Sequence, residues 1–201
     1  MADRLVPDAS GIAHAAGLLR DGGLVAFPTD TVYGIGCTAG DPTALERLFA
    51  AKRRAPDKAI PLLIASLDEA VGLGYRADEP ARKLAGRFWP GGLTIVLAGP
   101  TDRPRQAFRV PDHPVALALI AAAGPVATSS ANRSGEPETF DADEVQVAFA
   151  DSDEVAAVLD GGPVPGGVAS SVLDLSGERP HLVREGALPR SELESVIGPI
   201  D

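Results

Sequence analysis

A short apolar run that ends in a proline places the strongest constraint on the fold of this chain. Residues 24–27 have the length and composition of a buried strand. Pro28 has no N–H to give to a sheet and therefore marks the end of that strand. Thr29, Asp30 and Thr31 follow directly, at the carboxyl end of the strand, where open α/β sheets bind their ligands. The stretch is either a polar turn or one wall of a ligand site.

Apolar periodicity and turn residues predict alternating helices and strands along most of the chain. The expected helices cover residues 9–21, 42–54, a segment from 67, 78–88, 114–122, 142–150 and a short segment from about 191. The expected strands cover residues 24–27, 60–65, 93–98, 108–110, 126–130, 155–159 and a hairpin of 172–175 with 181–184. Tyr33, Gly34 and Gly36 are expected to shape the turn that follows residue 31.

Capping residues mark several of the expected helix starts. Asp41 is expected to cap the second helix, with Pro42 as its first residue. Residues 66–69 and 191–194 have the form of a capping box. The order of elements predicts one α/β domain over residues 1–201, with an open, twisted, mixed sheet flanked by helices. No segment is long or polar enough to separate two domains.

Charge and cysteine content exclude several classes of protein. The net charge of −10 argues against a broad nucleic-acid-binding surface, because phosphate recognition depends on clustered Lys and Arg. Cys37 is the single cysteine, which excludes an internal disulfide and a multi-cysteine zinc site. The sequence shows no signal peptide and no run of about 18 apolar residues, so a cytoplasmic protein without a membrane span is expected.

Cationic side chains gather where predicted elements end, which is conspicuous in an acidic protein. Lys52, Arg53, Arg54 and Lys58 lie at or just beyond the end of the second expected helix. Cations there complement the helix macrodipole. The same group also has the chemistry of a site for a phosphorylated ligand, since Arg provides a forked donor and Lys a compact charge. Both interpretations remain open from the residues alone.

Arg109 stands in an apolar segment, between Phe108 and Val110 and next to Pro111. This setting predicts an extended, half-buried arginine. A buried arginine requires an anionic partner. That partner is either an Asp of this protein or a carboxylate of a ligand.

Ser129, Ser130 and Asn132 end another expected strand and are either turn formers or ligand contacts. No His or Lys adjoins them in sequence, so an acyl-enzyme mechanism is not favoured. Residues 34–40 resemble the dinucleotide fingerprint but have one residue too many between their second and third glycines. The phosphate-binding pattern G-x-x-x-x-G-K-[ST] is absent from the sequence. Any nucleotide must therefore bind without either standard loop.

Seven short motifs resemble those of one family and follow one another in the same order. They are residues 28–34 (PTDTVYG), 51–54 (AKRR), 88–94 (FWPGGLT), 109–114 (RVPDHP), 130–135 (SANRSG), 159–162 (LDGG) and 183–187 (VREGA). Together they are similar to the YrdC-like family, the threonylcarbamoyl-AMP synthases, from about residue 10 to about residue 187. The resemblance implies a short, single-domain form that lacks the extra C-terminal domain of longer relatives.

The resemblance also implies a reaction and a fold. Members of the family join L-threonine, bicarbonate and ATP into threonylcarbamoyl-adenylate and release pyrophosphate. A partner enzyme complex then transfers the threonylcarbamoyl group to N6 of adenosine 37 in tRNAs that read ANN codons. The implied fold is an open, twisted α/β sheet with a large concave cavity lined by cations, and Mg²⁺ is expected to accompany ATP.

Carried over by position, the resemblance implies roles for individual residues. Thr31 corresponds to a contact with the substrate threonine, Arg109 to the clamp for its carboxylate, and Ser170 to a further contact. Lys52 and Arg54 match the family's K-x-R and are the implied catalytic residues, directed toward the phosphates and the carbamate. The implied ATP contacts are Arg54, Lys58, Ser130, Asn132, Thr139 and Arg184.

Some positions depart from the family pattern. The proline after the K-x-R arginine is displaced by one residue and stands at position 56. Glu138 and Thr139 share the region where a Ser or Thr near the nucleotide is usual. Because a carboxylate beside phosphates is unfavourable, we expect Thr139 to face the nucleotide.

Two other functions compete with this interpretation. The same fold has been linked to double-stranded RNA binding, so a module that contacts RNA or tRNA is the first alternative, and the net charge of −10 argues against high affinity. The second is a carbamoyl-transfer domain like that of hydrogenase-maturation proteins. Those proteins also carry acylphosphatase and zinc-finger segments, which this sequence lacks.

Overall fold

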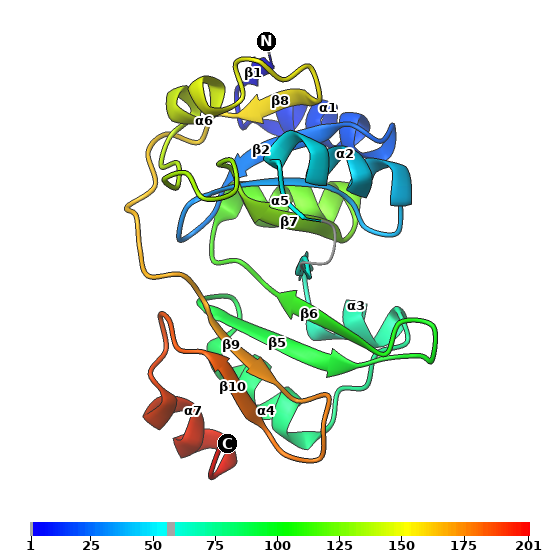
Figure 1. The fold of residues 1–201 in the computed structure, drawn as a ribbon, viewed down its shortest axis with the longest axis vertical. Helices are drawn as coiled ribbons and strands as arrows, with labels where there is room; N and C mark the ends of the chain where they lie inside the picture. Colours follow the sequence, from blue (N-terminus) through cyan, green and yellow to red (C-terminus); the bar gives the residue numbers. More distant parts are fainter. Residues whose placement is uncertain (1, 56–58) are drawn as a thin grey trace.

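One continuous sheet organises the molecule (Figure 1). The computed structural model describes residues 2–55 and 59–201, and the ten-stranded sheet has the order β1-β8-β2-β3-β7-β4-β6-β5-β9-β10. The strands are β1 (Asp3–Leu5), β2 (Leu24–Pro28), β3 (Tyr33–Thr38), β4 (Leu62–Leu63), β5 (Leu93–Ala98), β6 (Arg105–Arg109), β7 (Val126–Ser130), β8 (Val155–Leu159), β9 (Ser171–Asp174) and β10 (His181–Arg184). Parallel and antiparallel pairs both occur, so the predicted mixed α/β sheet is confirmed.

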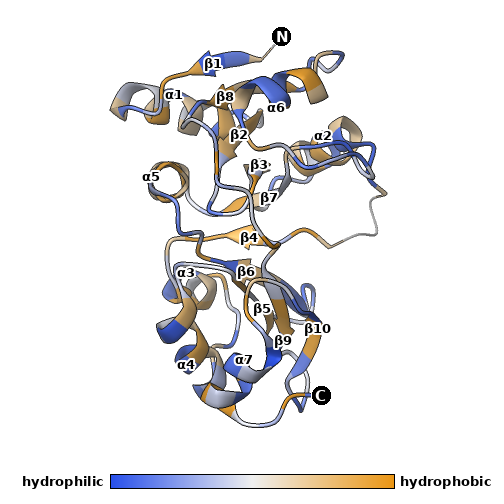
Figure 2. Cartoon of the chain, turned by 90° about the vertical axis from the view of Figure 1, so that its left-hand side faces the viewer, coloured by the Kyte–Doolittle hydropathy of each residue, from blue (hydrophilic) through white to orange (hydrophobic). Residues whose placement is uncertain are grey.

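Helices cover the sheet in two groups, one on each side of the short strand β4 (Figure 2). They are α1 (Ala9–Arg20), α2 (Pro42–Lys52), α3 (Leu67–Gly72), α4 (Glu79–Phe88), α5 (Pro114–Ala123), α6 (Ala142–Ala148) and α7 (Arg190–Ile197). In the described part of the chain no helix is long and apolar enough to cross a membrane.

Three apolar clusters form the core. Two of them lie in the half that holds β1, β8, β2, β3 and β7, where α1 packs against α5 and α2 covers β3. The third lies in the half that holds β5, β6 and β9, under α4 and α7. Figure 2 shows β4 as an apolar strand at the junction of the two halves. Because β4 pairs with both β7 and β6, the backbone ladder continues from one half into the other.

Local sequence signals explain several element boundaries. The Asp41 carboxylate accepts from the N–H groups of Thr43 and Ala44, and Pro42 begins α2, as the capping pattern predicts. Pro28 is the last residue of β2. A strand end is where a residue without an N–H is expected. The predicted C-terminal hairpin is the antiparallel pair β9 and β10.

The expected turn over residues 33–36 is wrong, because these residues begin the central strand β3. Gly34 and Gly36 serve close strand packing rather than a turn. A Cβ on Gly36 would lie 2.6 Å from Val126 Cγ1 and 2.7 Å from the Ala127 carbonyl oxygen on β7. The glycines let β3 approach β7, and turn propensity is overridden by this tertiary contact.

Other departures concern element ends. The strand expected over 60–65 is reduced to the two residues of β4, and β1 was not predicted. Ser66 makes no side-chain cap for α3, although Glu69 accepts from the N–H of Ala65 at 2.9 Å. The capping box expected at 191–194 is also wrong, since Pro189 precedes α7 and no side chain caps it.

Candidate active site

A cavity of about 700 Å³ lies where the two halves of the sheet meet. Its walls come from β5, β6, β7, β9 and β10, from the turn after β2, and from the segment before β4. Six of the residues to which the resemblance gave a role line it: Thr31, Arg54, Arg109, Ser130, Ser170 and Arg184. Side chains up to 153 positions apart along the chain are thus gathered around one space.

The turn after β2 holds Thr31 through a chain of hydroxyl contacts. Thr29 Oγ1 donates to the Val32 carbonyl oxygen at 2.7 Å, which uses its single proton. In the 3.2 Å contact between the two threonine hydroxyls, Thr31 must therefore be the donor. Thr31 consequently presents oxygen lone pairs, and not its proton, to its other neighbours.

Arg109 ends β6 and is almost fully buried, with 8% of its surface exposed. Its Nη2 donates to both Asp30 carboxylate oxygens, at 2.7 and 2.6 Å. Its Nε donates to the Gly91 carbonyl oxygen at 2.9 Å, and Nη1 lies 3.5 Å from Thr31 Oγ1. Of the two anionic partners that the sequence left open for Arg109, the structure shows the Asp of this protein, which is Asp30.

Ser170 and Arg184 form a second polar group in the lining of the cavity. Ser170 Oγ and Thr94 Oγ1 are hydrogen-bonded at 2.9 Å. Arg184 donates from Nε and Nη2 to the Ser170 carbonyl oxygen, at 3.1 and 2.7 Å. Ser170, a predicted threonine contact, and Arg184, a predicted ATP contact, are therefore direct neighbours.

Lys52 is placed differently from Arg54. Its Nζ donates to the carbonyl oxygens of Ser130 and Asn132, and only 2% of its surface is exposed. Burial, and secondarily the charge of Arg54, lowers the pKa of Lys52 to about 8. Arg54 lines the cavity and donates from Nη2 to the Ala59 carbonyl oxygen at 3.1 Å. The ammonium thus supports the cavity wall from behind, and its catalytic role stays a prediction.

The remaining predicted nucleotide contacts lie outside the lining found among the described residues. Asn132 is buried and donates from Nδ2 to the Glu136 carbonyl oxygen at 2.6 Å. Thr139 is also buried and donates to the Ala131 carbonyl oxygen at 2.9 Å, whereas Glu138 lines the cavity. Lys58 lies outside the described residues. The ATP contacts assigned to Asn132, Thr139 and Lys58 therefore remain predictions.

Arg105 is a cavity residue that the sequence reasoning missed. Its Nη1 lies 3.6 Å from Asp174 Oδ2, and Asp174 also lines the cavity. Arg105, Gln106, Ala107 and Arg109 all line the cavity along β6. Arg105 and Arg109 are an even number of positions apart, and side chains at such a spacing point to the same face of a strand. A strand that begins at residue 105 is therefore the signal that would have found Arg105.

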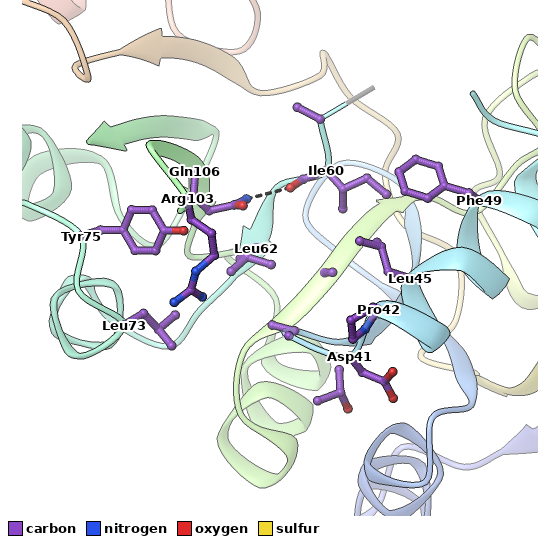
Figure 3. Close-up of a pocket in the computed structure, with 15 residues that line it drawn as sticks. Asp41, Pro42, Leu45, Phe49, Ile60, Leu62, Leu73, Tyr75, Arg103 and Gln106 are labelled. Atoms are coloured by element: carbon purple, nitrogen blue, oxygen red, sulfur yellow. Dashed lines mark hydrogen bonds between the residues drawn. The ribbon is translucent and has the colours of Figure 1, made fainter. Parts of the chain in front are cut away.

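A second cavity, of about 590 Å³, adjoins the first at Ile60 and Gln106 (Figure 3). Its lining is mostly apolar and includes Leu45, Phe49 and Tyr75. Gln106 and Ile60 line both cavities and are joined by a hydrogen bond from Gln106 Nε2 to the Ile60 carbonyl oxygen at 2.8 Å. This second space contains none of the predicted site residues that the structure describes.

Comparison with known proteins assigns the chain to a family. The Sua5, YciO and YrdC family model, described as "Telomere recombination", matches residues 17–186. The chain belongs to this family. It is 41% identical to a threonylcarbamoyl-AMP synthase of Bacillus subtilis over 98% of its length, and 43% identical to a threonylcarbamoyl-AMP synthase of Pyrococcus abyssi over 94%.

A solved structure extends this similarity to three dimensions. The crystal structure of Pyrococcus abyssi Sua5 complexed with L-threonine matches all of this chain with a TM-score of 0.89 and 41% identity. The chain spans 61% of that protein, and 60% and 58% of the Bacillus and Pyrococcus synthases. The YrdC-like resemblance and the α/β fold inferred from the motifs are confirmed.

Proposed function

We propose that this protein is a threonylcarbamoyl-AMP synthase, which makes threonylcarbamoyl-adenylate and pyrophosphate from L-threonine, bicarbonate and ATP. One observation carries the proposal: a single cavity gathers Thr31, Arg109 and Ser170 with Arg54, Ser130 and Arg184. The first three have hydroxyl and cationic groups suited to an amino acid. The others have donors suited to phosphates. A relative of 41% identity is described in complex with L-threonine.

The proposed chemistry places several anions in one space. The threonine amine takes up CO₂ derived from bicarbonate and loses a proton, which gives a carbamate. A carbamate oxygen then attacks the α-phosphorus of ATP, and pyrophosphate leaves. Both steps require charge stabilisation and alignment more than a protein nucleophile. Arg54, Arg105, Arg109 and Arg184, the arginines on the wall, are residues of the type that supplies both.

Mg²⁺ belongs to this proposal as the partner of ATP, whose phosphate oxygens supply most of its ligands. When bound, the ion would offset the charge of the triphosphate. Glu138 and Asp174 stand on the cavity wall and have the oxygen donors that Mg²⁺ accepts. We also propose that the protein acts in the cytoplasm and passes its product to a threonylcarbamoyl-transferase complex. Any direct contact with tRNA is expected to be weak, because the net charge is −10.

An activity assay tests the proposal directly. The protein is incubated with ATP, Mg²⁺, labelled bicarbonate and one amino acid, and both pyrophosphate and labelled adenylate are measured. Threonine should give far more of both products than serine, and omission of bicarbonate should abolish them. The assignment is wrong if threonine releases no more pyrophosphate than buffer. Tight, strongly salt-dependent tRNA binding that ATP does not affect would support the RNA-binding alternative.

A further inference from the structure

We propose that Asp30 is a positioning residue, which holds the Arg109 guanidinium so that its Nη1 edge alone is presented to the carboxylate of the bound amino acid. The inference deepens the proposed function and rests on it. Asp30 and Arg109 come from opposite sides of β4, on the turn after β2 and at the end of β6. Their contact therefore joins the two halves of the molecule inside the candidate active site.

Asp30 is itself held in place. Its Oδ1 accepts from the Asp112 N–H at 3.1 Å in addition to Arg109 Nη2. The side chains of Asp30 and Arg109 are 19% and 10% exposed, so the ion pair is largely withdrawn from water. Arg109 lines the cavity, whereas Asp30 is not part of the lining defined by the described residues. Asp30 thus lies behind the arginine.

A count of donors shows what Asp30 leaves for a ligand. A guanidinium has five N–H groups. The Nε proton goes to the Gly91 carbonyl oxygen, and Nη2 donates to both oxygens of the Asp30 carboxylate. Nη1 remains, and one of its two protons is directed at Thr31 Oγ1, 3.5 Å away. A substrate carboxylate would therefore bind at Nη1 beside Thr31, rather than across the two-nitrogen fork that a free arginine offers.

Threonine binding to the Asp30→Asn variant tests this arrangement. Asn keeps the size and one acceptor oxygen, but it has no negative charge and no second oxygen to accept from Nη2, so Arg109 loses its fixed orientation. The dissociation constant for threonine, measured calorimetrically with ATP and Mg²⁺ present, should rise about tenfold, while that for ATP changes little. Asp112→Asn is the matched control, because it removes the same charge from an exposed neighbouring side chain and should bind threonine as the wild type does.

A double-mutant cycle separates positioning from a general effect on the fold. In an Arg109→Gln background, Asp30→Asn should change threonine affinity less than twofold, because Asp30 acts through Arg109. The paired variant replaces an ion pair with two amides, so it leaves no buried charge unpaired. An unchanged or tighter dissociation constant in Asp30→Asn would overturn the inference, and so would an equal loss in both backgrounds.

The two proposals fail in different ways. If the wild type binds threonine and shows the Asp30 effect but releases no pyrophosphate, the inference stands and the proposed function is wrong. If the wild type is active and Asp30→Asn matches it in threonine affinity, only the inference is wrong. Failure of the wild type to bind threonine overturns both.

Discussion

At the scale of single residues, the direction of Lys52 differs most from expectation. Its position in the K-x-R motif implies an ammonium that faces phosphates. In the structure the ammonium lies under the turn after β7 and donates to the Ser130 and Asn132 carbonyl oxygens. Ser130 lines the cavity, so Lys52 shapes the wall through the backbone. Because of these two hydrogen bonds, Lys52 is needed to form the site even if its ammonium does not touch a substrate.

Lys52→Met tests that structural role. Methionine fills a similar volume but leaves the Ser130 and Asn132 carbonyl groups without their charged donor, which should lower the free energy of unfolding by about 3 kcal/mol. Urea denaturation at neutral pH measures the loss, and Arg53→Met, on an exposed neighbour, is the control. A variant that is inactive but as stable as the wild type would contradict this role and favour direct catalysis.

The Lys52→Met substitution should also change how the free energy of unfolding depends on pH. Burial lowers the pKa of Lys52 to about 8 in the folded protein, against 10.5 ordinarily. Between these values the unfolded chain binds the extra proton, so this group makes stability rise with pH. The stability difference between wild type and Lys52→Met should therefore grow from about pH 8 to about pH 10. Urea midpoints of both proteins measure it, and a constant or shrinking difference would contradict the expected sign.

At the scale of elements, the glycines of β3 decide how closely it packs on β7. Gly36→Ala would place a methyl group 2.6 Å from Val126 Cγ1 and 2.7 Å from the Ala127 carbonyl oxygen. We expect a loss of about 2 kcal/mol in unfolding free energy. Gly17→Ala is the control, since beyond the adjoining backbone of α1 nothing lies within 4 Å of the added Cβ, and it should stabilise by up to about 1 kcal/mol. Equal effects of the two substitutions in thermal denaturation would refute this packing argument.

The start of α5 contains a titratable cap. His113 Nδ1 accepts from the Val115 N–H at 3.3 Å. Burial lowers the pKa of His113 from 6.5, although nearby Asp30 and Asp112 oppose the shift. The unfolded chain therefore binds more protons near and below pH 6.5, and stability falls as the pH drops through this range. His113→Asn keeps a capping acceptor that does not titrate, so its stability should fall less on acidification, as followed by urea midpoints. If the urea midpoints of the two proteins depend on pH in the same way, protonation of His113 is not coupled to unfolding.

At the scale of the whole molecule, a strand of two residues joins two halves with separate apolar cores. Each half carries a unique natural probe. Cys37 lies in the core beside β7, and Trp89 packs against the core under α4 and α7. Burial raises the pKa of the Cys37 thiol to about 12, so native protein should resist alkylation near neutral pH.

The two probes should report one unfolding transition. Because β4 pairs with β7 and β6, and Asp30 pairs with Arg109 across the junction, loss of either half exposes the other. Trp89 fluorescence and Cys37 labelling in urea should therefore give the same midpoint. Ligand binding in the cavity should raise both midpoints equally. Clearly separated midpoints would contradict this cooperativity and show that the halves unfold independently.

The sequence by itself determined the α/β class, most helices, the terminal hairpin and six of the residues that line the candidate site. These depend on local periodicity, capping and turn chemistry, as for Asp41 before α2, or on motif order. Only the tertiary structure decided which groups meet. Asp30 and Arg109 are 79 positions apart, and Lys52 and Ser130 are 78 apart. Side-chain direction depends on packing between distant segments, and no local pattern encodes which buried charge will find which partner.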